Sequence, residues 1–291
     1  MLADLFAVIA PVFVCAGLGF AWARTGRAYD MDMVSGLVFN FGAPCLIAVT
    51  IVRTRLTPEV LGTLGAATTV TIAICGFIGW GLLRLLRWPV AAYLPGLMFA
   101  NTTNMGLALA LFAFGPEGLA MAIPVTVIAG TGTFAIGTAI MTGSLSLGQL
   151  LRLPTLYGLV VGLIFQLGDI EPPAWLENSA HTLGNMVIPI MLVTLGVSLA
   201  RLKFHSLRRS AVLAVVRLAL GFGVSVGVAA LFGLEGMSRG VLIVLMSMPT
   251  AVFNYLLALR FSDTADEVAG MVVASTCLSF LLLPALMWYV R

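Results

Sequence analysis

NTTNMGLAL (Asn101–Leu109) lies inside an apolar run that extends from Val90 to Phe114. A run of this length can cross a bilayer as a helix, yet its centre carries two asparagines and two threonines. An amide side chain at bilayer depth is costly unless it is hydrogen-bonded, and Gly106 permits an unwound backbone. The pattern predicts a membrane-spanning helix that is broken near the middle of the bilayer.

A second apolar run, from Gly240 to Leu259, has a similar polar centre. It contains Pro249, which has no backbone N–H and disrupts a helix, and then Asn254. The two centres align without a gap at an offset of 148 residues. The chain is therefore predicted to contain two related broken helices.

The composition indicates the solvent in which these helices lie. Of the 291 residues, 60% are hydrophobic and only 9% are charged, with a mean hydropathy of +1.09. A soluble domain carries about 25% charged residues, and a membrane β-barrel alternates polarity in strands of roughly ten residues. The continuous apolar runs predict an all-α polytopic membrane protein with the lipid bilayer as its surroundings.

Ten apolar stretches are long enough to be membrane spans. The Lys and Arg residues favour the loops after odd-numbered spans, ten against four for the other loops and the C-terminus. The positive-inside rule then places the odd loops in the cytoplasm and both termini outside a cell (inner) membrane. Arg24 and Arg27 follow the first run rather than precede it, so we expect a mature span and no signal peptide there. The expected spans are Leu5–Ala23, Val34–Val52, Val60–Leu83, Val90–Phe114, Gly118–Met141, Leu153–Leu167, Leu176–Ala200, Ala211–Phe232, Gly240–Leu259 and Val268–Tyr289.

The two halves resemble each other weakly, as residues 1–142 and 143–291. Five spans in each half make the second copy inverted, so spans four and nine run in opposite directions and can cross at their breaks. Inverted repeats with broken helices are typical of secondary transporters. Two half-helix N-termini, each with about half a positive charge, would face one cavity suited to a carboxylate.

The candidate substrate-binding residues all come from these two centres. The alternative is that these side chains only join helices by interhelical hydrogen bonds. The matched position beside a helix breaker in both halves favours a site. The predicted substrate-binding residues are Asn101, Thr102, Asn104, Met105, Gly106, Pro249, Thr250 and Asn254.

Residues beyond this set could support or edge the cavity. Asn40 and Pro44 in span two share their spacing with Asn185 and Pro189 in span seven. Arg217 lies inside span eight, where it could be a counter-ion for the substrate, pair structurally or extend to the cytoplasmic interface. The last two interpretations are slightly favoured.

Other polar and small residues have simpler interpretations. Gly158-x-x-x-Gly162 and Gly223-x-x-x-Gly227 indicate close helix packing. Hydroxyl groups within spans, such as those of Thr126 and Thr276, are expected to bond to their own helices. No Asp or Glu is placed well inside a span and no Cys or His spacing suits a metal, so we expect no sodium or proton relay, no metal, no cofactor, no enzyme activity and no nucleic-acid partner.

Five segments resemble the auxin efflux carrier family, which includes bacterial malonate/malate permease-like members and the plant PIN carriers. The segments are spread over almost the whole chain and occur in the family's order. They are FNFGAPCLIAV (Phe39–Val49), NTTNMGLAL (Asn101–Leu109), IPIMLVTLGVSLA (Ile188–Ala200), MPTAVFNYLLALRF (Met248–Phe261) and SFLLLPAL (Ser279–Leu286).

The resemblance implies ten helices in two inverted five-helix repeats. Helices 1, 2, 6 and 7 would form a scaffold that can dimerise, and helices 3–5 and 8–10 a moving transport domain. It also implies elevator-type transport of organic anions without sodium, with Asn101 in contact with the substrate. Ala108 and Asn254 stand where relatives have prolines, which argues against auxin as the substrate.

The sequence is consistent with three functions. The favoured one is a uniporter, exchanger or secondary active transporter of a small mono- or dicarboxylate. A sodium-coupled symporter of the bile-acid type shares the ten-helix plan but needs buried acidic ligands. A receptor that has a transporter fold is the third.

Overall fold

The computed structural model describes residues 2–54, 57–144, 148, 153–202, 207–261 and 264–290. Within these ranges the regular structure is helical, and seven segments are long and apolar enough to cross a bilayer. The chain is thus an α-helical polytopic membrane protein, as its composition predicts. Ten spans and an inverted repeat remain predictions, and four cations counted for the orientation, Arg55, Arg152, Lys203 and Arg291, lie outside the described residues.

The helices coincide with the predicted apolar runs, except that α6 (Leu107–Gly132) joins the end of the fourth run to the fifth through a kink at Gly115, whose φ is 71°. In chain order, the first half has α1 (Leu2–Arg24), α2 (Met31–Leu37), the π-helical turn η1 (Val38–Gly42), α3 (Ala43–Thr54), α4 (Pro58–Leu85), α5 (Val90–Met98), the π-helical turn η2 (Thr102–Gly106), α6 (Leu107–Gly132), the π-helical turn η3 (Thr133–Gly137) and α7 (Thr138–Thr142). The second half has α9 (Pro154–Leu167), α10 (Ala174–Asn185), α11 (Val187–Arg201), α12 (Leu207–Leu231), α13 (Gly236–Met246), α14 (Val252–Phe261) and α15 (Ala265–Val290).

Proline explains the irregular turns at the two matched Asn and Pro pairs. Pro44 cannot donate to the carbonyl of Asn40, four residues earlier, and the chain forms the π-helical turn η1 just before this proline. Pro189 cannot donate to Asn185, and there α10 ends and α11 begins. The matched spacing therefore marks a break in helical hydrogen bonding in each half.

Glycine explains how closely some helices approach one another. A Cβ atom on Gly196 of α11 would overlap the carbonyl oxygen of Ala16 in α1, and α9 approaches α3 through Gly158 and Gly162. The prediction of close packing is wrong for Gly223 and Gly227, because a Cβ on either would meet no atom of the described chain within 4 Å. Equal spacing does not determine which face of a helix is covered.

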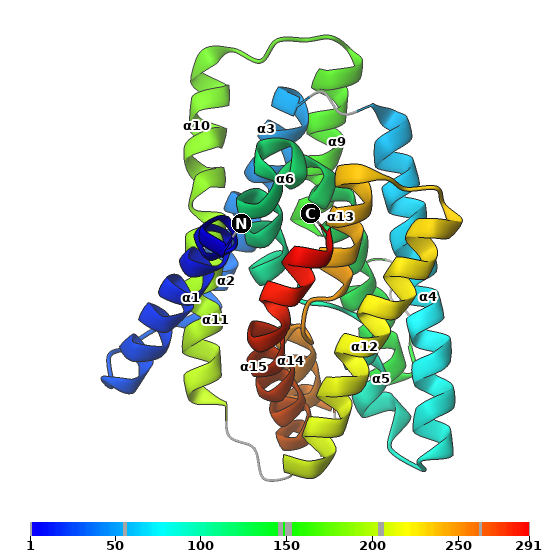
Figure 1. Cartoon of the computed structure of the whole chain (residues 1–291). Coiled ribbons are helices and arrows are strands. Elements are labelled where there is room, and N and C mark those ends of the chain that lie inside the picture. Colours follow the sequence, from blue (N-terminus) through cyan, green and yellow to red (C-terminus); the bar gives the residue numbers. More distant parts are fainter. Residues whose placement is uncertain are drawn as a thin grey trace.

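The helices form two groups that meet along one interface. In the first group α1 packs along α11, and α3 packs against α9 and α10; α10 and α11 form one long column (Figure 1). In the second group α12 packs against α4, α13 and α15, and α14 packs against α15. Helix α6 packs against α4 and α13 of the second group and also contacts α3 and α1 of the first, so the candidate site lies where the groups meet.

Candidate functional site

Both predicted broken helices are interrupted, and the interruptions cross each other. Helix α5 ends at Met98 and α13 ends at Met246. Ala100 and Thr250 then form an antiparallel bridge, in which the Asn101 amide donates to the Pro249 carbonyl at 2.8 Å and the Ala251 amide donates to the Phe99 carbonyl at 3.4 Å. Each extended segment thus satisfies backbone groups of the other, as buried peptide groups require.

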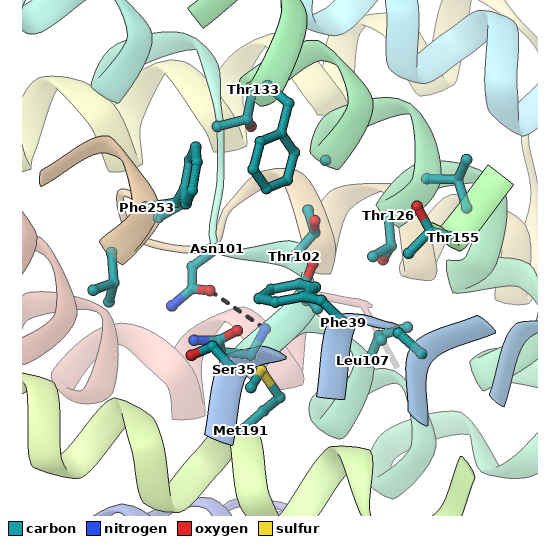
Figure 2. Close-up of a pocket in the computed structure, with 18 of the residues that line it drawn as sticks. Ser35, Phe39, Asn101, Thr102, Leu107, Thr126, Thr133, Thr155, Met191 and Phe253 are labelled. Carbon is teal, nitrogen blue, oxygen red and sulfur yellow. Dashed lines mark hydrogen bonds between the residues drawn. The ribbon is translucent and has the colours of Figure 1, made fainter. Parts of the chain in front are cut away.

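Asn101 begins the second half of the first broken helix. Its Oδ1 accepts a hydrogen bond from the Asn104 amide at 3.4 Å, which caps the turn η2 (Figure 2). The side chain is only 3% exposed, and its Nδ2 has no hydrogen-bond partner in the described part of the chain. A buried amide donor without a partner is costly, and an acceptor brought to Asn101 would remove that cost.

A cavity of about 150 Å³ lies at this helix start, between the two groups of helices. One wall has Asn101, Thr102 and Asn104, and Phe253 of α14 also faces the cavity (Figure 2). The opposite wall comes from α2, η1, α3, α9 and α11 and includes Ser35, Phe39, Thr155, Met191 and Thr194.

Thr126 is a cavity residue for which the sequence predicts another role. Its hydroxyl was expected to bond to its own helix, but its Oγ1 is buried and has no partner among the described atoms. That expectation is wrong for Thr126, whereas the Thr276 hydroxyl does donate to the Val272 carbonyl at 2.7 Å. No feature of the sequence near Thr126 distinguishes it from Thr276, which follows the expectation.

The two extended segments cross at the bridge between Ala100 and Thr250, which we call the crossover. The second broken helix contributes its polar residues to this crossover instead of to the cavity wall. Thr250 is fully buried, and its hydroxyl donates to the Gly96 carbonyl at 3.0 Å. Asn254 is also fully buried, and its Nδ2 donates to the Phe99 carbonyl at 3.5 Å. We call the first broken helix, α5 with η2, the first arm, and the second broken helix, α13 with α14, the second arm. With Pro249, whose carbonyl accepts from the Asn101 amide, Thr250 and Asn254 hold the two arms together in this conformation.

The two remaining predicted residues of the first arm lie behind it. Met105 is fully buried in the main apolar core. Gly106 lies against Leu245 of α13, where an added Cβ would come within 3.1 Å of the leucine Cγ. Neither lines the cavity, so the first arm presents Asn101, Thr102 and Asn104 to it.

Arg217 lies at the back of the crossover. It is fully buried; Nη1 donates to the Leu97 carbonyl at 3.1 Å and Nη2 to the Met246 carbonyl at 2.9 Å. The interpretation in which Arg217 extends to the cytoplasmic interface is wrong, because its guanidinium holds the last turns of α5 and α13. Structural pairing is the interpretation that the geometry supports.

The other predicted supporting residues lie away from this cavity. Asn40 is exposed and Pro44 packs against Gly158, so neither lines it. Asn185 and Pro189 line a second cavity, of about 400 Å³, nearer the other end of the α10 and α11 column. Leu46 of α3 lines both cavities, so the two cavities are neighbours along that helix.

Comparison with known proteins identifies a family and two relatives that match part of the chain. The family model described as "Membrane transport protein" matches residues 138–289, just over half of the chain. An uncharacterized transporter of Methanothermobacter thermautotrophicus is 26% identical over 194 residues, which are 63% of this chain and 63% of that protein. An uncharacterized transporter of Methanocaldococcus jannaschii is 26% identical over 204 residues, 66% of this chain and 65% of that protein. The chain thus covers less than two thirds of the length of either relative.

Proposed function

This chain belongs to the membrane transport protein family, and from that premise we propose that it carries a small organic anion, a mono- or dicarboxylate, across the membrane. The observation that carries the proposal is the unpartnered Nδ2 of Asn101 beside the cavity. A carboxylate oxygen is an acceptor for this amide, and a charged acceptor gains more than a neutral one.

Helix ends near the cavity support an anion over a neutral or cationic solute. The turn η2 continues into α6, so Asn101 stands at the N-terminus of a long helical segment. Helix α14 begins at Val252, which also lines the cavity. Free N–H groups and a partial positive charge at helix N-termini favour negative ligands.

The two cavities support alternating access by an elevator movement. They lie at opposite ends of the interface between the two helix groups, and apolar side chains separate them: Leu46, Leu107, Leu111, Met191 and Leu192. A shift of the group that carries Asn101 along the other group would expose the site to each side in turn. In the orientation predicted from the Arg distribution, the Asn101 cavity is on the cytoplasmic side, since it reaches Ser198 near the end of α11.

The membrane arrangement and the assembly are part of the same proposal. The distribution of Lys and Arg over the loops would place the chain in the cell membrane with both termini outside. Phe6, Phe13 and Leu18 expose an apolar face of α1. In the proposal this face meets lipid or the scaffold of a second copy.

A thermal-shift screen of purified protein with small mono- and dicarboxylates tests the function. A ligand that binds the folded state raises the melting temperature by mass action, and we expect a shift with at least one carboxylate and none with its neutral amide. Uptake of that acid into proteoliposomes should be equal in sodium and potassium buffers. A requirement for sodium would favour the bile-acid-type symporter instead.

A further inference from the structure

Arg217 is a buried cation with no acidic partner among the described residues. Ion pairs in the described ranges join Arg53 to Glu177 and Arg209 to Glu267, and neither involves Arg217. The titratable side chain beside Arg217 is the Cys75 thiol, which brings no fixed negative charge. Removing a guanidinium from water is costly, so its surroundings must supply a compensating interaction.

The compensation comes from helix ends. Leu97 and Met246, whose carbonyls accept from the guanidinium, lie in the last turns of α5 and α13. The last four carbonyls of a helix lack partners within the helix, and together they amount to about half a negative charge. The full positive charge of Arg217 therefore offsets the two negative helix ends.

This cancellation changes the field at the crossover. Two broken helices bring together two C-terminal and two N-terminal ends, whose partial charges of about one half each would otherwise sum to roughly zero. With the C-terminal ends neutralised, the positive ends at η2 and α14 act unopposed on the cavity. Arg217 itself does not line the cavity.

We propose that Arg217 is a positioning residue that sets the charge selectivity of the site by cancelling the C-terminal ends of both broken helices. The inference rests on the proposed function and specifies how that site prefers a carboxylate to a neutral analogue. Hydrogen bonding alone does not explain the residue, because the guanidinium Nε is buried with no partner in the described part of the molecule. Its charge is therefore the property that matters.

The decisive variant leaves Arg217 in place. Cys75→Asp puts a carboxylate beside the guanidinium, whereas Cys75→Asn is nearly the same size and adds no charge. Binding of malonate, succinate and benzoate is measured against malonamide, succinamide and benzamide in the purified proteins. We expect the preference for acid over amide to fall about tenfold or more in Cys75→Asp and to stay at the wild-type level in Cys75→Asn.

Arg217→Gln and Arg217→Lys give a second pair that does not depend on Cys75. Glutamine keeps an N–H donor without charge and should lose the preference, whereas lysine keeps the charge and should retain it. A folded Cys75→Asp or Arg217→Gln protein with an unchanged preference would overturn the role of Arg217. Wild-type protein that binds acids and amides equally would contradict the proposed function itself.

Discussion

The two arms of the crossover are related in sequence but differ in what they present. The first arm turns Asn101 toward the cavity and leaves its Nδ2 without a partner. The second arm buries Asn254 completely and uses its amide to hold Phe99 of the first arm. One arm is thus available for a ligand while the other fixes its position, so a repeated motif need not give repeated roles.

The contacts at the C-terminal ends of α5 and α13, the first halves of the two arms, also differ. Arg217 binds a carbonyl from each, and Met246 of the second arm also lies against the backbone of α12, where a Cβ on Gly221 would overlap its carbonyl oxygen. The second arm is therefore held by close backbone packing against α12 in addition to its hydrogen bonds. The variants below separate these roles.

Gly221→Ala should have the largest effect, because it pushes the second arm away from α12. The added methyl would overlap the Met246 oxygen, a backbone atom that cannot give way as a side chain can. We expect a loss of about 3 kcal/mol or more in stability, seen as a lower melting temperature or yield. Gly223→Ala on the same helix faces open space, and an equal loss there would contradict the packing of α12.

Asn101→Asp should have the next largest effect, on binding through the first arm. The change keeps the size of the side chain and its capping oxygen, but it replaces the free amide donor with a negative charge. A like charge at a binding site costs several kcal/mol, so carboxylate affinity should fall about 100-fold while the fold is retained. Binding is measured by calorimetry or thermal shift.

Asn101→Ala separates charge from hydrogen bonding at the same position. It removes the donor without adding repulsion, and one hydrogen bond to a charged ligand corresponds to roughly tenfold in affinity. If both variants bound malonate, succinate and benzoate like the wild type, the cavity would not be the substrate site.

Much of the architecture could be predicted from the sequence. Apolar runs determine the helices because lipid requires each backbone group to bond within its own segment. The polar centres near Asn101 and Pro249 predict the interruptions that occur after Met98 and Met246. These features are local in the chain, so the residue order alone contains them.

The direction in which individual side chains point could not be predicted in this way. Asn101 faces the cavity and Asn254 is buried because of the way in which the extended segments pair at Ala100 and Thr250. The partners of Arg217 are equally nonlocal, because Leu97 is 120 residues away in the chain. Such contacts depend on the docking of helices from both halves, which no local pattern specifies.

Thr250→Val should have a moderate effect on the second arm. It preserves shape but removes the hydroxyl that donates to the Gly96 carbonyl at 3.0 Å, which leaves a buried acceptor without this donor. We expect about 1–2 kcal/mol of destabilisation, measured by thermal unfolding in detergent. Thr276→Val is the control, because the Thr276 hydroxyl donates to the Val272 carbonyl of its own helix. This substitution should destabilise the protein less. Equal losses would show that Thr250 does not link the arms.

Asn254→Ala should have the smallest effect on binding and gives the sharpest contrast with Asn101→Ala. Its bond to Phe99 is long at 3.5 Å, and its Oδ1 already lacks a partner in the described structure. Truncation therefore removes a weak link and an unsatisfied acceptor together, so we expect about 1 kcal/mol of lost stability and carboxylate affinity within about twofold of the wild type. Similarity of the two arms in sequence would instead predict a tenfold loss of affinity for both alanine variants. A tenfold loss in Asn254→Ala would mean that the second arm turns this amide toward the ligand during transport.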